Sequence, residues 1–161
     1  MKFNITIGNP PYQENDGGGQ GTSAKPLYNL FVQHCCSLAN HLVMIVPARW
    51  YCGGKGLDDF RTFMLYRANV VELYDFDKLY EIFDTVKIPG GICYFHIDNT
   101  KKRDLCRIHN RGNTVDRKIV EPWSDCLIRS NKMINILNKV VRPDDYTFDY
   151  IVSERKSYGL I

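Results

Sequence analysis

The sequence predicts an α/β fold with a mixed sheet, because strand-like and helix-like segments alternate over most of its 161 residues. Short, apolar, β-branched segments recur along the chain, and segments with apolar residues at helical spacing separate the first three of them. The later strand-like segments follow one another without a helix, which predicts an antiparallel pair after the parallel strands. A content of 44% hydrophobic and 24% charged residues is typical of a folded domain and excludes a disordered chain.

The first half of the chain predicts two strands with a helix between them. Lys2–Gly8 alternates and is β-branched, and this strand ends at Asn9–Tyr12, since two prolines cannot continue a ladder. Gln13–Lys25 is polar and rich in glycine, which predicts a mobile loop. Leu27–Ala39 has an apolar helical face, and the continuous apolar run His41–Pro47 predicts a strand buried on both faces of a parallel sheet.

Further elements follow in the same order. Arg49–Gly56 is predicted to be a loop, and Leu57–Arg67 a helix whose first turn carries two aspartates, which favour the positive end of its dipole. Val70–Phe76 and Gly91–Asp98 are predicted strands, with the irregular segment Lys78–Pro89 between them.

The last third predicts two shorter strands and one helix. The strands are Leu105–Asn110 and Lys118–Glu121, and the helix is Arg129–Val141, ended by Pro143. The last twenty residues show no clear period.

Charge and cysteine content narrow the functional classes. The net charge of +3 is mild, but residues 100–118 contain seven Lys or Arg against two Asp, which favours either a solvated hairpin or a phosphate-facing edge. The six cysteines form no Cys-x-x-Cys pair, so we expect reduced thiols, a cytoplasmic protein and no metal site. The longest apolar run is far shorter than the ~20 residues that span a bilayer, so no membrane segment is expected.

The segment Asn9-Pro10-Pro11-Tyr12 points to chemistry, because it follows the first strand where open α/β sheets bind their ligands. Its prolines stiffen the loop and leave two backbone nitrogens without hydrogens. The Asn9 side-chain oxygen and the Pro10 carbonyl could accept both hydrogens of an exocyclic amine, which makes its lone pair available for attack on a methyl sulfonium. Tyr12 offers a face on which a purine can stack. The alternative is an ordinary proline-rich turn with a capping asparagine.

These residues resemble a known family. Ile5–Gln13 resembles motif IV of the amino-group DNA methyltransferases, specifically the N6-adenine enzymes that use S-adenosylmethionine. Other segments resemble later parts of the type II restriction-modification methylases. Leu27–Val32 resembles motif V, Val43–Tyr51 resembles motif VI, and Gly53–Arg61 resembles the next helix. Ile82–Phe95 resembles motif VIII, and Ser153–Leu160 resembles the stretch that leads into target recognition.

The resemblance implies roles for individual residues. Asn9 and Pro10 would accept the amine hydrogens, Pro11 would support them, and Tyr12 would stack on a flipped adenine. Phe83 would pack on the other side of the base and Phe31 would line the adenine of the cofactor; the alternative for both is an ordinary core position. Contacts with DNA phosphates are expected from five basic residues: Arg49, Lys55, Lys101, Lys102 and Arg103.

The resemblance also implies what the chain lacks. The family's cofactor-binding half, with a glycine-rich turn and an acidic residue for the ribose, precedes motif IV, and only eight residues precede Asn9. The chain therefore resembles the C-terminal half of a Rossmann-like S-adenosylmethionine-dependent methyltransferase fold. Residues 1–128 would be a partial catalytic domain with motifs IV to VIII, and residues 129–161 a helix and linker toward a target-recognition region.

The implied function is methylation of adenine N6 in double-stranded DNA, in a restriction-modification system, by a fragment expected to be inactive alone. The free edge of the first strand is expected to pair with a companion that carries the missing half, or with a second copy. Two alternatives remain: a non-catalytic DNA-binding or assembly remnant, and a protein-glutamine methyltransferase.

Overall fold

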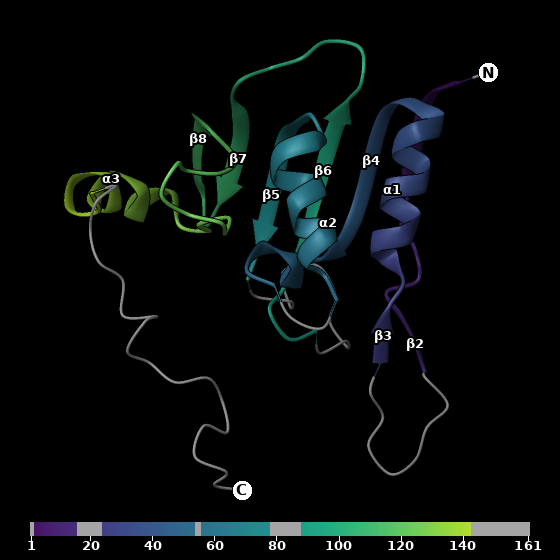
Figure 1. Ribbon diagram of the computed structural model, residues 1–161. Helices are drawn as coiled ribbons and strands as arrows, with labels where there is room; N and C mark the ends of the chain where they lie inside the picture. The colour runs from purple at the N-terminus through teal and green to yellow at the C-terminus, as the bar shows by residue number, and fades with distance from the viewer. Residues whose placement is uncertain (1, 16–23, 54–55, 78–87, 143–161) are drawn as a thin grey trace, which may run out of the picture.

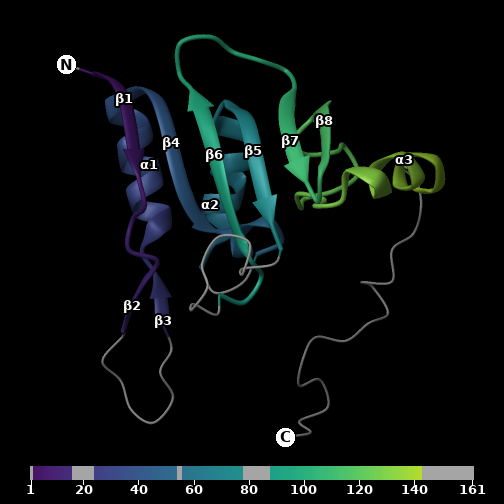
Figure 2. The same ribbon diagram turned by 180° about the vertical axis from the view of Figure 1, so that it is seen from behind.

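A six-stranded mixed sheet organises the computed structural model, which describes residues 2–15, 24–53, 56–77 and 88–142. Across the sheet the strands are β1 (Phe3–Gly8), β4 (Ala39–Pro47), β6 (Ile92–Asp98), β5 (Val70–Phe76), β7 (Cys106–Asn110) and β8 (Asn113–Arg117) (Figure 1; β1 is labelled in Figure 2). β1 and β4 are parallel, as are β5 and β7, whereas β6 runs antiparallel to both neighbours. This arrangement confirms the predicted α/β fold with a mixed sheet.

Helices cover one face of the sheet. α1 (Tyr28–Leu38) packs on β4, and α2 (Asp58–Thr62), continued by the π-helical segment η2 (Phe63–Arg67), lies over β5 and β6. From the opposite side the strands lie in front of both helices, and no helix of the described residues covers that face (Figure 2). α3 (Asn131–Val140) lies beyond β8. None of the described helices is long and apolar enough to cross a membrane.

The core lies between the helices and the covered face. Leu42, Met44 and Val46 of β4 are buried there, and the Phe60 ring meets Tyr28 and Trp50 edge-on at centroid distances of 5.7 and 5.9 Å. The alternate residues of β4 from His41 to Ile45 are only half-buried. The prediction that β4 is buried on both faces of a parallel sheet is therefore wrong, because its second face has no described cover and β6 pairs with it antiparallel.

Most predicted elements are confirmed to within a few residues. They are the strands predicted at 2–8, 41–47, 70–76, 91–98 and 105–110, and the helices predicted at 27–39, 57–67 and 129–141. The predictions made for residues 78–87 and 143–161 lie outside the described residues.

Three predictions need correction. The predicted strand at 118–121 is absent; β8 precedes it and pairs with β7 through a tight turn in which Arg111 and Gly112 both have positive φ, 47° and 71°. Such a turn fits the twist of a hairpin. The predicted loop Gln13–Lys25 begins and ends in short antiparallel strands, β2 (Gln13–Asn15) and β3 (Ala24–Pro26). The loop predicted after β4 begins as a 3-10 turn, η1 (Ala48–Tyr51).

The predicted boundary between residues 128 and 129 stays a prediction. α3 is anchored to the sheet at its first residue, where the buried Asn131 amide donates to the Ile108 carbonyl at 2.8 Å and accepts from Arg117 Nε at 3.0 Å.

Candidate active site

The segment Asn9–Tyr12 lies at the carboxyl end of β1. The neighbouring parallel strand β4 ends at Pro47 on the same edge of the sheet. Parallel strands place their ligand sites at this edge. Pro10 is buried against the fold, whereas Asn9 and Pro11 are exposed and Tyr12 is half-buried. The buried proline thus fixes the segment between two residues that face outward.

The small β2–β3 hairpin brings a second segment to the same place. Gln13 pairs with Pro26, so the chain returns beside Tyr12, and the Leu27 amide donates to the Tyr12 carbonyl at 3.1 Å. As a result Pro26 of β3 and Tyr28, the first residue of α1, line the same cleft as Asn9 although they are distant from it in the sequence.

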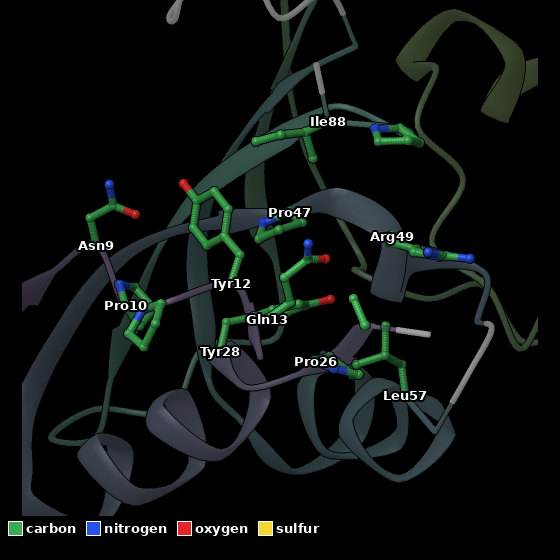
Figure 3. Close-up of a pocket in the computed structure, with 13 residues that line it drawn as sticks. Asn9, Pro10, Tyr12, Gln13, Pro26, Tyr28, Pro47, Arg49, Leu57 and Ile88 are labelled. Carbon is green, nitrogen blue, oxygen red and sulfur yellow. The ribbon is translucent and has the colours of Figure 1, made fainter. Parts of the chain in front are cut away.

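These segments enclose an open cleft of about 510 Å³. Figure 3 shows Asn9 and Tyr12 on one side of the cleft, with Arg49 and Ile88 on the other. A cleft of this size accommodates a small ligand such as a nucleobase with its sugar. Its walls are formed by Asn9, Pro10, Pro11, Tyr12, Gln13, Ala24, Pro26, Tyr28, Pro47, Arg49, Leu57, Ile88 and Pro89.

Two hydrogen-bond acceptors of the cleft have no partner among the described residues. In the described part of the chain, neither the Asn9 side chain nor the Pro10 carbonyl has a hydrogen-bond partner. Burial raises the pKa of the Tyr12 hydroxyl, so this ring stays neutral at ordinary pH. No Asp, Glu or His is found among the described residues that line the cleft. The described part of the cleft therefore offers two acceptors, an aromatic face and the Arg49 cation.

The family comparison agrees with this geometry. The family model described as Eco57I restriction-modification methylase matches residues 1–83, which include β1, the Asn9–Tyr12 segment and the helical layer. The chain belongs to this methylase family. The predicted membership of a restriction-modification methylase family is confirmed.

A curated relative supports the same assignment. An uncharacterised adenine-specific methylase of Mycoplasma pneumoniae (strain ATCC 29342 / M129 / Subtype 1) is 36% identical over 98 residues. The match covers 59% of this Eco57I-family chain and 23% of the relative. The chain thus spans about a quarter of the length of the curated relative.

Solved structures share the fold. The methyltransferase subunit of a type I restriction-modification system from Streptococcus thermophilus matches with a TM-score of 0.51 at 13% identity, over 85% of this chain and 31% of that subunit. A modification subunit from Vibrio vulnificus YJ016, assigned to a type I restriction enzyme, gives 0.50 at 12% identity with the same coverage. These matches confirm the Rossmann-like methyltransferase fold and place the Eco57I-family chain within less than a third of either subunit.

The remaining predicted residues of the methylase chain lie in different places. Arg49 lines the cleft, is exposed and has no ion-pair partner among the described residues. Phe31 is 44% exposed on α1 and does not line the cleft, so its predicted contact with the cofactor stays a prediction. Lys55 and Phe83 lie outside the described residues.

The basic segment after β6 is far from the cleft. β6 starts opposite Pro47 and ends opposite His41, so Lys101, Lys102 and Arg103 follow its end at the opposite edge of the sheet from Asn9. Seven strand residues separate the two edges by roughly 20 Å. The structure does not bring these three residues together with Arg49, and their contact with DNA stays a prediction.

The cleft by itself does not fit S-adenosylmethionine. The ribose hydroxyls of such a cofactor usually donate hydrogen bonds to a carboxylate of the protein. No carboxylate lines the described cleft. The described residues of the Eco57I-family chain therefore do not form a complete site for that cofactor.

Proposed function

We propose that this chain provides the amine-binding side of an adenine-N6 DNA methyltransferase of a restriction-modification system. One observation carries the proposal: two acceptors without a partner among the described residues, Asn9 Oδ1 and Pro10 O, line the same cleft as the Tyr12 ring, at the sheet edge used for ligands. An exocyclic amine has two hydrogens for these acceptors, and a purine ring has a face for Tyr12.

The chemistry of these residues is hydrogen bonding rather than proton transfer. Two acceptors that bind both amine hydrogens draw the nitrogen toward tetrahedral geometry, which releases its lone pair from the ring for attack on a methyl group. The nitrogen becomes positive when the new N–C bond forms and the methyl–sulfur bond of the donor breaks, with the electron pair of that bond left on sulfur. The nitrogen then loses one proton. This proton passes to water.

The substrate is proposed to be adenine turned out of double-stranded DNA. In a base pair the N6 amine is already hydrogen-bonded and its face is covered by neighbouring bases, so enzymes that react there extrude the base. Arg49, an exposed cation that lines the cleft and has no ion-pair partner in the described part of the chain, is suited to a flanking phosphate. A DNA substrate also agrees with the proposed cytoplasmic location.

The methyl donor is proposed to be S-adenosylmethionine, bound mainly by other residues of the methylase. The structure of β1 favours a companion that binds the cofactor. β1 is an edge strand, and its outward side chains Phe3, Ile5 and Ile7 are 63%, 52% and 72% exposed. Edge strands with an apolar face tend to pair with another strand. We propose that the rest of the methylase catalytic domain occupies this edge.

The test is methyl transfer in a mixture of this chain and the remaining catalytic region of a family methylase, with radiolabelled S-adenosylmethionine and duplex DNA. Asn9→Ala is expected to lower the rate by ~10²–10³, the cost of one preorganised polar contact to a reacting group. Gln13→Ala, a neighbouring polar residue of the cleft with no proposed role, is the matched control and should retain activity.

The outcomes separate the alternatives. Full activity of Asn9→Ala would show that Asn9 does not accept the amine hydrogens. Label on glutamine side chains of a protein substrate, and none on DNA, would favour a protein-glutamine methyltransferase. Binding of DNA without any transfer would favour the non-catalytic remnant.

A further inference from the structure

A half-buried arginine, Arg129, pairs with a buried aspartate, Asp75, at the edge of the sheet that carries the cleft. Arg129 donates to both carboxylate oxygens of Asp75, from Nη2 at 2.6 Å and from Nε at 2.9 Å. The Asp75 side chain has no exposed surface, and the Asn110 amide donates to it at 2.7 Å. A carboxylate with this many donors is satisfied without water. Asp75 precedes the last residue of β5, so the pair marks the carboxyl end of that strand.

The same guanidinium extends to a second segment. Arg129 Nη1 donates to the Gly90 carbonyl at 2.6 Å, and the guanidinium carbon lies 5.4 Å from the centre of the Tyr51 ring. The Leu127 amide also donates to the Tyr51 carbonyl at 3.0 Å. One side chain therefore joins β5, the turn at Gly90 and η1.

The turn at Gly90 is closely packed. Gly90 and Gly91 have φ of 91° and 82°, values that favour glycine. A Cβ atom on Gly91 would lie 2.3 Å from the Phe76 carbonyl oxygen and 3.0 Å from Arg129 Nη2. The turn thus has little freedom to shift while Arg129 is in place.

Both segments joined by Arg129 form walls of the cleft. The Gly91 amide donates to the Ile88 carbonyl at 3.2 Å, and the Ala48 amide donates to the Gly91 carbonyl at 3.0 Å. Ile88 and Pro89 line the cleft, as does Arg49 of η1, on the side that faces Tyr12 (Figure 3).

We propose that Arg129 is a positioning residue for the nucleobase site: with Asp75 and the Gly90 carbonyl it forms a clamp that sets the distance between the Ile88–Arg49 wall and Tyr12. This clamp rests on the proposed function, because it acts on the cleft assigned to the adenine. Its effect is on the width of the cleft, and Arg129 itself does not line the cleft. The sequence gives no sign of it, since 54 residues separate Asp75 from Arg129.

The test uses the whole chain and three variants. Arg129→Lys retains the charge but cannot donate to both Asp75 oxygens and Gly90 together, because an ammonium lacks the planar fork. Arg129→Ala removes the clamp. Arg107→Ala is the matched control, since it breaks an exposed arginine–aspartate pair with Asp116 on β7 and β8, away from the cleft. Amide hydrogen exchange and adenosine titration are followed by NMR.

We expect Arg129→Lys to accelerate exchange of the Ala48 and Gly91 amides about tenfold or more, as loss of a charge-assisted hydrogen bond does. Amides in the centre of β5 and β6 should keep their exchange rates in this variant. Adenosine affinity should fall by about fivefold or more in both Arg129 variants and remain unchanged in Arg107→Ala.

Two results would overturn the clamp: wild-type exchange of Ala48 and Gly91 in Arg129→Lys, or equal acceleration of all amides, which indicates a general loss of stability. In either case adenosine binding by the wild-type chain would remain as support for the proposed function. Failure of the proposed base-binding function gives a different result from failure of the clamp. If adenosine shifts the NMR signal of no cleft amide in the wild-type chain, the base-binding function is wrong. The positioning role of Arg129 is then wrong too, whatever the exchange rates.

Discussion

The exposed side of β1 gives the sharpest prediction on assembly. Ile7 is 72% exposed on the edge strand, on the face that no described helix covers. Full burial of an isoleucine side chain contributes about 1.5–3 kcal/mol, so covering the exposed part of Ile7 contributes about 1–2 kcal/mol. Ile7→Thr keeps the β-branched shape and removes most of this gain. Association through this face should therefore weaken about tenfold.

The assay is a titration of the chain, alone and with the remaining catalytic region of a family methylase, followed by sedimentation velocity. Leu30→Gln is the matched control, because Leu30 is 52% exposed on α1, on the opposite layer. Denaturant unfolding of the isolated chain should give similar stability for both variants, since each side chain faces solvent there. Equal weakening by both variants, or none by Ile7→Thr, would refute the role of β1. Self-association lost only in Ile7→Thr would identify a second copy as the occupant.

Two further predictions concern titratable groups. Burial raises the pKa of the Cys93 thiol to about 12, so iodoacetamide at pH 8 should modify the exposed Cys52 first and Cys93 only when the chain unfolds. Peptide mass mapping would show this order. Early modification of Cys93 would contradict its burial. Burial, followed by the nearby His41, lowers the pKa of His96 below its ordinary value of about 6.5. The unfolded chain then binds the proton more readily, so stability present above that value is lost as the pH falls through 6.5 toward the folded pKa. Thermal unfolding from pH 7 to 5 should show a smaller loss for His96→Asn, and an equal loss would exclude His96.

Local patterns predicted the parts of the fold that depend on neighbouring residues. β1 and the Asn9–Tyr12 segment could be predicted because two adjacent prolines end a strand whatever surrounds them. β8 could not, since its five residues are mostly polar and exposed and its pairing depends on the Arg111–Gly112 turn. The β2–β3 strands were missed for a related reason, because three residues carry too little periodicity to indicate a strand.

The site divides in the same way. Asn9 and Tyr12 belong to one run of four residues, so their chemistry could be inferred from residue type alone. Ile88 and Arg129 reach the cleft or its wall through β5, β6 and the Gly90 turn, contacts that no local pattern records. The basic residues expected to contact DNA show what a local pattern leaves out: their charge could be read from the sequence, but only the direction of β6 places Lys101–Arg103 at the opposite end of the strands from Arg49.

On the uncovered face of the sheet, the side chains change from aliphatic on β1 to stacked rings and ion pairs on the strands at the other side. This difference explains why β1 in particular needs a partner. Over β5, β6 and β7, rings stack on one another: Tyr74 lies 3.8 Å from His109 and 4.3 Å from Tyr94 between centroids. Beyond them Arg107 pairs with Asp116. Stacked rings and ion pairs tolerate water, whereas the aliphatic side chains on β1 do not.

Exposure of apolar surface to water is therefore most unfavourable at β1, and Asn9 directly follows this strand. A strand that paired in parallel with the free edge of β1 would end beside Asn9, because parallel strands finish at the same edge of a sheet. The residues that follow such a strand would border the cleft on the side away from Arg49. Burial of the apolar surface of β1 and completion of the cleft would then be one event, so Ile7→Thr should weaken association and methyl transfer in parallel. Asn9→Ala should lower the transfer rate by ~10²–10³ and leave association intact.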